Sequence, residues 1–143
     1  YFVSYEDLHI HELMLKDTAR MAFFAHALDE MAAAGQLIGK TVLDVGSGTG
    51  VLSMMAAKRG AARVIAVEAS QGVAELSRKA IADNGLSDII TVVNNRVEDL
   101  ALSEESEKPD VLISEWMGFY LLHEVSALFQ FISLHLHSSS LIF

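Results

Sequence analysis

Residues 41–50 read TVLDVGSGTG, a short apolar run with one acid that leads directly into a loop of alternating glycines. Helical spacing of apolar residues resumes from Val51 to Arg59, and Gly60 ends it. A short run rich in β-branched residues favours a strand, and glycines placed directly after it favour a tight turn. The stretch therefore predicts a strand, a glycine loop and a helix with no spare residue between them.

The same alternation continues on both sides of this stretch. The expected strands are residues 63–68, 89–94, 110–114 and 140–143, and the expected helices are residues 10–31, 71–84 and 121–137. Strands that alternate with helices of about a dozen residues imply a parallel sheet with right-handed crossovers. The acidic segment 103–109 is expected to be a solvated loop. The predicted fold class is therefore α/β, with a mostly parallel sheet and flanking helices.

Composition narrows the class of protein. The chain has 143 residues, of which 52% are hydrophobic, which suits one domain with a single core. The formal net charge of -9 disfavours direct binding of nucleic acid and suits cationic ligands or basic protein tails. No cysteine is present and the six histidines lack metal-site spacing, so we expect no metal. The acidic N-terminus does not resemble a secretory signal, and the apolar segment 125–137 is shorter than a bilayer span, so we expect no membrane partner.

The glycine loop predicts a nucleoside ligand. Its pattern is GxGxG, which lacks the third glycine expected in the dinucleotide fingerprint, and Asp44 stands two residues before Gly46. This acid lies near where a cationic amino-acid group could bind. Glu68 follows Gly46 by 22 residues at the end of the next strand, where an acid can accept hydrogen bonds from both ribose hydroxyls. S-adenosylmethionine combines a ribose, a sulfonium and an amino acid without phosphate. The alternative is a tight turn with no ligand.

A second pattern predicts the substrate. Residues 114–124 read SEWMGFYLLHE and place two acids, Glu115 and Glu124, nine positions apart after an apolar strand. Carboxylates beside an apolar loop are costly to bury unless they meet a cation, and a guanidinium presents five donors in a rigid fork. An arginine side chain is therefore the expected substrate. Held by two carboxylates, it would keep its free nitrogen at attack distance from a methyl donor. The alternative is that these acids face solvent.

Together these motifs resemble the protein arginine methyltransferase family. Residues 42–50 resemble its glycine-rich cofactor motif, residues 64–70 its second-strand motif and residues 114–124 its double-glutamate loop. The N-terminus also resembles the family's opening helices, with YFVSY at residues 1–5 and HELMLKDTAR at residues 11–20. The likeness covers residues 1–124 and implies a Rossmann-like class I methyltransferase fold with S-adenosyl-L-methionine as the cofactor.

The resemblance also implies roles for individual residues. It implies that Arg20 binds the cofactor carboxylate and that Glu98 lies near the adenine amino group. Met14 and Trp116-Met117-Gly118 resemble the subgroup that forms asymmetric dimethylarginine. The full expected site comprises Glu115 and Glu124 as catalytic residues, His11, Met14, Arg20, Asp44, Gly46, Gly48, Glu68 and Glu98 at the cofactor, and Tyr5, Met14, Trp116 and Met117 at the substrate.

The resemblance weakens after Glu124, and the chain stops at Phe143, about where the family's last Rossmann strands begin. We therefore expect a fold truncated before the family's β-barrel. Residues 1–34 would form a helical segment over the cofactor, and residues 35–143 an S-adenosylmethionine-binding domain with an incomplete C-terminus. The isolated chain is then expected to have little activity and to self-associate or bind a partner.

The implied partners are arginine-containing proteins such as histone tails or Arg-Gly-rich segments, with a homodimer in the full-length form and a cytoplasmic or nuclear location. Two alternatives stay open. One is a non-catalytic module that binds and regulates a full-length methyltransferase. The other is a small-molecule methyltransferase of the same fold.

Overall fold

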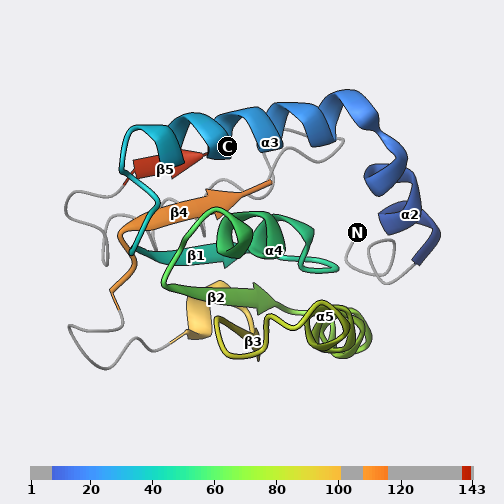
Figure 1. Ribbon diagram of the computed structural model, residues 1–143. Coiled ribbons are helices and arrows are strands. Elements are labelled where there is room, and N and C mark those ends of the chain that lie inside the picture. Colours follow the sequence, from blue (N-terminus) through green and yellow to red (C-terminus); the bar gives the residue numbers. More distant parts are fainter. Residues whose placement is uncertain (1–7, 101–107, 116–139, 143) are drawn as a thin grey trace.

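The computed structural model of the chain describes residues 8–100, 108–115 and 140–142, and within them one sheet organises the fold. Its strands are β1 (Thr41–Val45), β2 (Arg63–Glu68), β3 (Ile90–Asn94), β4 (Val111–Ser114) and β5 (Ser140–Ile142). They lie in the order β3-β2-β1-β4-β5, and every neighbouring pair is parallel (Figure 1). The predicted parallel α/β sheet is confirmed, with strand ends that differ from the prediction by about one residue.

Helices come before and between the strands. They are α2 (Leu8–Lys16), α3 (Thr18–Ala33), α4 (Val51–Lys58) and α5 (Gln71–Asp83), with a short 3-10 turn η1 (Val97–Asp99). The prediction of one helix over residues 10–31 is wrong, because the chain breaks at Asp17. This residue is extended, with φ -71° and ψ 93°, and its side chain accepts a hydrogen bond from Arg20 N at 3.1 Å. An aspartate cap of this kind starts a new helix. The expected helix at residues 121–137 lies outside the described residues.

Alternating side chains of the strands divide the core into two layers. Val42, Val64 and Ile113 pack with Phe24 and Leu28 of α3 and with residues of α4 and α5 on one face. The other face carries Leu43, Ile65, Val67 and Leu112, which pack with Val97 and Leu100 at the η1 turn. This period of two is the pattern of a strand that is buried on both sides.

Helix α3 shares the core of the sheet. In addition, the guanidinium of Arg59, the C-cap residue of α4, binds the carboxylate of Asp29 on α3, with Nε 2.7 Å from Oδ1 and Nη2 3.3 Å from Oδ2. This contact lowers the pKa of the Asp29 carboxyl. The predicted division at residues 34 and 35 stays a prediction, although α3 and the sheet are joined by one hydrophobic cluster.

The carboxyl ends of the parallel strands meet at one edge. The register pairs Val45 with both Val67 and Ser114, and Glu68 with Asn94, so the strands β1 to β4 end almost level. Figure 1 shows the arrowheads of β1, β2 and β4 pointing to the side where α2 lies. In open α/β sheets this edge is where ligands bind. No helix in the described part of the chain is long and apolar enough to cross a membrane.

Candidate active site

The glycine loop joins β1 to α4 and is fixed by backbone hydrogen bonds to β2. The N–H groups of Gly46 and Ser47 donate to the carbonyl of Val67 at 2.9 and 3.0 Å. Gly50 takes φ +82°, and a Cβ added there would lie 2.6 Å from the Ser77 hydroxyl on α5. Only glycine fits this position without strain, because it needs both a left-handed backbone and the missing side chain. The loop is therefore held close to two neighbouring elements.

Glu68 stands at the end of β2 and ties the loop to the strand. One of its oxygens accepts from Gly48 N at 2.9 Å, and the other accepts from Ser70 N at 2.8 Å. Asn94 fixes the main chain beneath it, donating to the carbonyls of Glu68 and Ala69 at 2.8 and 3.1 Å. A carboxylate has about four acceptor positions, so two remain for hydroxyl groups of a ligand. The carboxylate is thus already oriented toward the loop.

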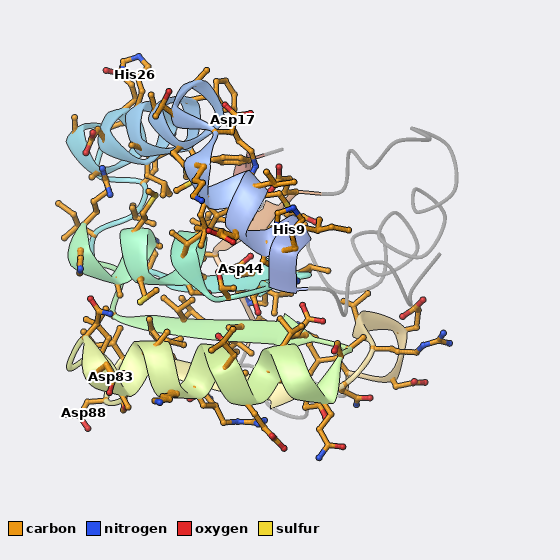
Figure 2. The ribbon with its side chains drawn as sticks, turned by 90° about the vertical axis from the view of Figure 1, so that its right-hand side faces the viewer. His9, Asp17, His26, Asp44, Asp83 and Asp88 are labelled. Carbon is orange, nitrogen blue, oxygen red and sulfur yellow. The ribbon has the colours of Figure 1, made fainter. Side chains whose placement is uncertain are left out.

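Asp44 is buried beneath the loop, with an exposed fraction of 1%. Figure 2 shows it in the interior, whereas His26 and Asp88 lie at the periphery. Its carboxylate accepts from Ser53 Oγ of α4 at 2.6 Å. Burial raises the pKa of Asp44 to about 6. The hydrogen bonds from Ser53 lower this pKa in part, and the negative charge of nearby Glu68 raises it further. As placed, Asp44 joins the end of β1 to α4 through Ser53, and a direct contact with a ligand, as the sequence predicts, would require its carboxylate to become accessible.

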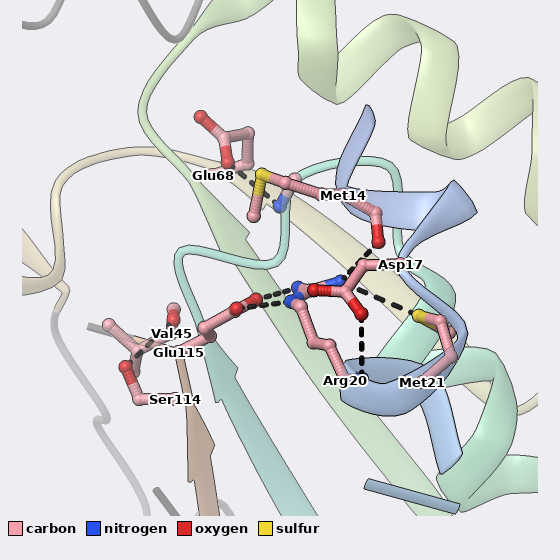
Figure 3. Close-up of polar contacts among 9 residues, drawn as sticks. Met14, Asp17, Arg20, Met21, Val45, Glu68, Ser114 and Glu115 are labelled. Carbon is pink, nitrogen blue, oxygen red and sulfur yellow. Dashed lines mark hydrogen bonds and ion pairs between the residues drawn. The ribbon is translucent and has the colours of Figure 1, made fainter. Parts of the chain in front are cut away.

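Arg20 and Glu115 meet across the carboxyl edge of the sheet (Figure 3). Nε and Nη2 of Arg20 face the two oxygens of Glu115, so the pair is a bidentate ion pair. The side chains are 16% and 20% exposed. Nη1 of Arg20 donates to the carbonyl of Met14 at 3.0 Å, and the guanidinium carbon lies 5.6 Å from the centre of the Phe24 ring. Desolvation lowers the pKa of Arg20, partly offset by the charge of Asp17.

Glu115 is positioned by the strand that precedes it. The hydroxyl of Ser114, the last residue of β4, donates to the carbonyl of Val45 at 3.1 Å and so ties the end of β4 to the end of β1. Glu115 follows directly and faces α3. The structure therefore joins a residue expected at the cofactor to one expected at the substrate.

The remaining expected residues fall into three groups. His11 of α2 lies over the glycine loop, with its ring 3.2 Å from where a Cβ on Gly48 would be. Met14 is half-buried beside Arg20, and Gly46 and Gly48 shape the loop with positive φ. Glu98 is exposed on η1, and within the described residues no hydrogen bond joins it to this group. Four predicted residues lie outside the described residues, namely Tyr5, Trp116, Met117 and Glu124.

Sequence reasoning missed four polar residues that support this site. Ser53 donates to Asp44, and Asn94 donates to the main-chain carbonyl of Glu68. Ser70 donates its N–H to the Glu68 carboxylate, and Asp17 caps the helix that carries Arg20. Only Asp17 carries a local signal, since an aspartate three residues before a backbone donor is a typical cap. The buried hydroxyl of Ser47 has no partner among the described residues, which leaves a polar atom in the loop for a ligand or water. No cluster of metal-binding side chains occurs within the searched, described part of the chain.

Comparison with known proteins agrees with this geometry. A family model described as a methyltransferase domain matches residues 42–138, which include the glycine loop, Glu68 and Glu115. The chain belongs to the methyltransferase domain family. Its sequence is also similar to those of protein arginine N-methyltransferases: it is 45% identical over 124 residues to protein arginine N-methyltransferase 1.1 of Arabidopsis thaliana, a match that covers 87% of this chain and 30% of the relative.

Two solved structures extend the match to three dimensions. Protein arginine methyltransferase 10 of Arabidopsis thaliana is 37% identical with a TM-score of 0.86, over 98% of this chain and 39% of that chain. A chain of the Trypanosoma brucei PRMT1 enzyme–prozyme heterotetrameric complex with AdoHcy is 46% identical with a TM-score of 0.76, over 85% of this chain and 36% of that one. The predicted family and Rossmann-like fold are confirmed. This chain spans about a third of the length of the curated relatives that it matches.

Proposed function

We propose that this chain is the cofactor-binding part of an enzyme that transfers methyl groups from S-adenosylmethionine to arginine side chains of proteins. The observation that carries the proposal is the pairing of Glu115 with a guanidinium beside the glycine loop. Arg20 supplies this guanidinium, and its fork geometry shows that the Glu115 carboxylate can bind an arginine side chain through both oxygens. The substrate arginine would present the same group to the same carboxylate.

The residues of the site fit the proposed cofactor. Glu68 has acceptor positions left for two ribose hydroxyls, and Arg20 is a cation suited to the carboxylate of the amino-acid part. His11 lies against the loop, where it could contact the same ligand. The glycine loop brings backbone close to the ligand without side chains in between. When bound, S-adenosylmethionine would supply a methyl group activated by a sulfonium.

The chain's own acids would prepare the substrate nitrogen. A guanidinium is a poor nucleophile because its lone pair is delocalised and because it stays protonated near pH 7. Glu115, together with Glu124, would draw positive charge toward the nitrogens that they bind and leave the free nitrogen more nucleophilic. The same grip would fix the nitrogen at attack distance, and one of the two acids would accept the released proton.

Finer assignments follow from the family. We infer that the product is asymmetric dimethylarginine, and that substrates include histone tails or Arg-Gly-rich segments, whose positive charge suits a chain of net charge -9. The full-length protein would form a homodimer and act in the cytoplasm, the nucleus or both.

The test uses the full-length protein that contains this chain, an Arg-Gly-rich peptide and labelled S-adenosylmethionine. Methylated arginine should form, and fragmentation mass spectrometry should identify it as asymmetric dimethylarginine. Glu115→Gln should remove most of the activity, whereas Glu75→Gln, which changes an exposed carboxylate on α5, should not. Normal turnover in Glu115→Gln, or an exclusively symmetric product, would contradict the proposal.

A second candidate is a non-catalytic module that binds and regulates a full-length methyltransferase. The similar trypanosomal structure favours it, because that assembly combines an enzyme with a prozyme. Mixing this chain with the full-length protein distinguishes the two. A regulatory module should change the turnover of the full-length protein in proportion to the complex formed, whereas a catalytic fragment without that role should leave it unchanged.

A further inference from the structure

Arg20 has too few free donors to bind a second carboxylate through a pair of hydrogen bonds while it is paired with Glu115. A guanidinium carries five N–H donors, one on Nε and two on each terminal nitrogen. In the structure, Nε and one donor of Nη2 face Glu115, while Nη1 donates to Met14 O at 3.0 Å and contacts Met21 Sδ at 3.4 Å. One donor of Nη2 has no partner among the described residues. A second carboxylate could therefore make only one strong bond while Glu115 keeps its grip.

The geometry of the guanidinium also limits how a second carboxylate can bind Arg20. Two parallel bonds to a carboxylate need two donors on one edge of the guanidinium, and the edge formed by Nε and Nη2 belongs to Glu115. The Met14 carbonyl occupies Nη1, and the Phe24 ring lies against the guanidinium at 5.6 Å. The side chains of Arg20 and Glu115 are both mostly buried, so water cannot easily replace a lost partner of either one.

We infer that the carboxylate of the cofactor and Glu115 compete for Arg20, so that binding of the cofactor frees Glu115 for the substrate arginine. This inference rests on the proposed function and adds an order to it. Arg20 is then a positioning residue that couples the two halves of the site. Arg20 binds Glu115 until the cofactor carboxylate binds the same N–H donors of Arg20. Glu115 then has both oxygens available for a second guanidinium.

The competition has an unusual consequence for a substrate-binding acid. If Glu115 only bound substrate, its removal would not change the affinity for the cofactor. If Glu115 held Arg20 in place for the cofactor, its removal would weaken binding. Competition predicts the opposite sign, because a ligand no longer has to displace Glu115. This gain in affinity should also require the carboxylate of the ligand, since the nucleoside part is not expected to bind Arg20.

The experiment measures dissociation constants by calorimetry for two ligands that differ only in that carboxylate, S-adenosylhomocysteine and decarboxylated S-adenosylhomocysteine. Glu115→Gln should bind S-adenosylhomocysteine about five- to tenfold more tightly than the unchanged chain. The affinity for the decarboxylated ligand should not rise. Because the ratio of the two affinities is taken within each variant, a partial loss of folded protein cancels.

Two further variants serve as controls. In an Arg20→Lys background, Glu115→Gln should give no gain, because a lysine cannot offer the disputed pair of donors. Asp17→Asn removes a carboxylate that acts on Arg20 through space and keeps the helix cap, since asparagine caps as well as aspartate. Asp17→Asn should change the ratio of the two affinities by less than Glu115→Gln does, which separates the ion pair from a general charge effect.

The outcomes distinguish this inference from the proposed function. If the folded chain binds neither ligand, the proposed cofactor fails and the inference fails with it. If it binds both ligands and Glu115→Gln leaves the ratio unchanged or lowers the affinity for S-adenosylhomocysteine, the competition alone is overturned. An equal gain in Asp17→Asn would also overturn it.

Discussion

The guanidinium of Arg20 in the first turn of α3 and the carboxylate of Glu115 after β4 form a bidentate pair between residues 95 positions apart. Through this pair the N-terminal helices are joined to the carboxyl edge of the sheet, beside the glycine loop (Figure 3). The pair is 16% and 20% exposed, so solvent screens it only in part. It therefore stabilises the fold as well as shaping the site.

Replacement of Arg20 should destabilise the chain. We expect Arg20→Ala to lower the free energy of unfolding by about 2 kcal/mol, because it leaves the Glu115 carboxylate half-buried without its partner. Arg20→Lys should cost less, about 1 kcal/mol, since the charge remains and the fork is lost. Urea unfolding measures both. As a control, Lys16→Ala removes an exposed pair with Glu12 and should cost no more than about 0.5 kcal/mol. Equal losses of unfolding free energy in Arg20→Ala and Lys16→Ala would show that the mostly buried pair stabilises the fold no more than the exposed pair does.

The stability of the chain should depend on pH through Asp44. Its folded-state pKa of about 6 lies above the unfolded value of 3.8, so the folded chain keeps the proton over a range where the unfolded chain has lost it. The stabilisation is complete below about pH 4 and is lost as the pH rises through 6. Relative to Asp44→Asn, the unchanged chain should lose on the order of 3 kcal/mol between pH 4 and pH 7. Denaturant unfolding of both chains at pH 4 and pH 7 measures this difference. An equal change in the free energy of unfolding of the two chains would contradict the raised pKa of Asp44.

Two glycines provide a matched pair of substitutions. Gly50→Ala should destabilise the chain by about 2 to 4 kcal/mol, because φ is +82° and the new Cβ would lie 2.6 Å from Ser77 Oγ. Gly72→Ala should instead stabilise it by about 0.5 to 1 kcal/mol, since Gly72 is helical and a Cβ there meets nothing within 4 Å. Thermal unfolding compares the two. A loss of similar size in both variants would mean that the loop geometry is not what makes Gly50 necessary.

The sequence was sufficient to predict the sheet because the relevant signals are local. Apolar strands, glycines at turns and helical spacing each act within about ten residues, and β1, β2 and β4 lie where that spacing predicted. The break at Asp17 was missed because the apolar spacing continues across it from Met14 to Met21. Here the side-chain cap outweighs the periodicity.

The site was predictable only in part, because its contacts cross long stretches of sequence. The positions of Glu68 at the end of β2 and of Glu115 directly after β4 follow from local pattern, and both lie at the carboxyl edge. The pairing of Arg20 with Glu115 has no local signal. The sequence assigns Glu115 to the substrate side only, which implies nearly unchanged cofactor affinity in Glu115→Gln, whereas the pair with Arg20 predicts a change. Likewise, the burial of Asp44 against Ser53 depends on how α4 packs on β1.

The central claim is that this carboxyl edge binds S-adenosylmethionine, and the most direct measurement is calorimetric titration of the folded chain with S-adenosylhomocysteine and with NAD. We expect S-adenosylhomocysteine to bind and NAD not to bind. Glu68→Ala should weaken binding of S-adenosylhomocysteine by about 1 to 3 kcal/mol, because the ribose hydroxyls and Gly48 N lose a charged acceptor. Glu75→Ala, which removes an exposed carboxylate on α5, should bind as the unchanged chain does. A folded chain that binds NAD but not S-adenosylhomocysteine would contradict the account.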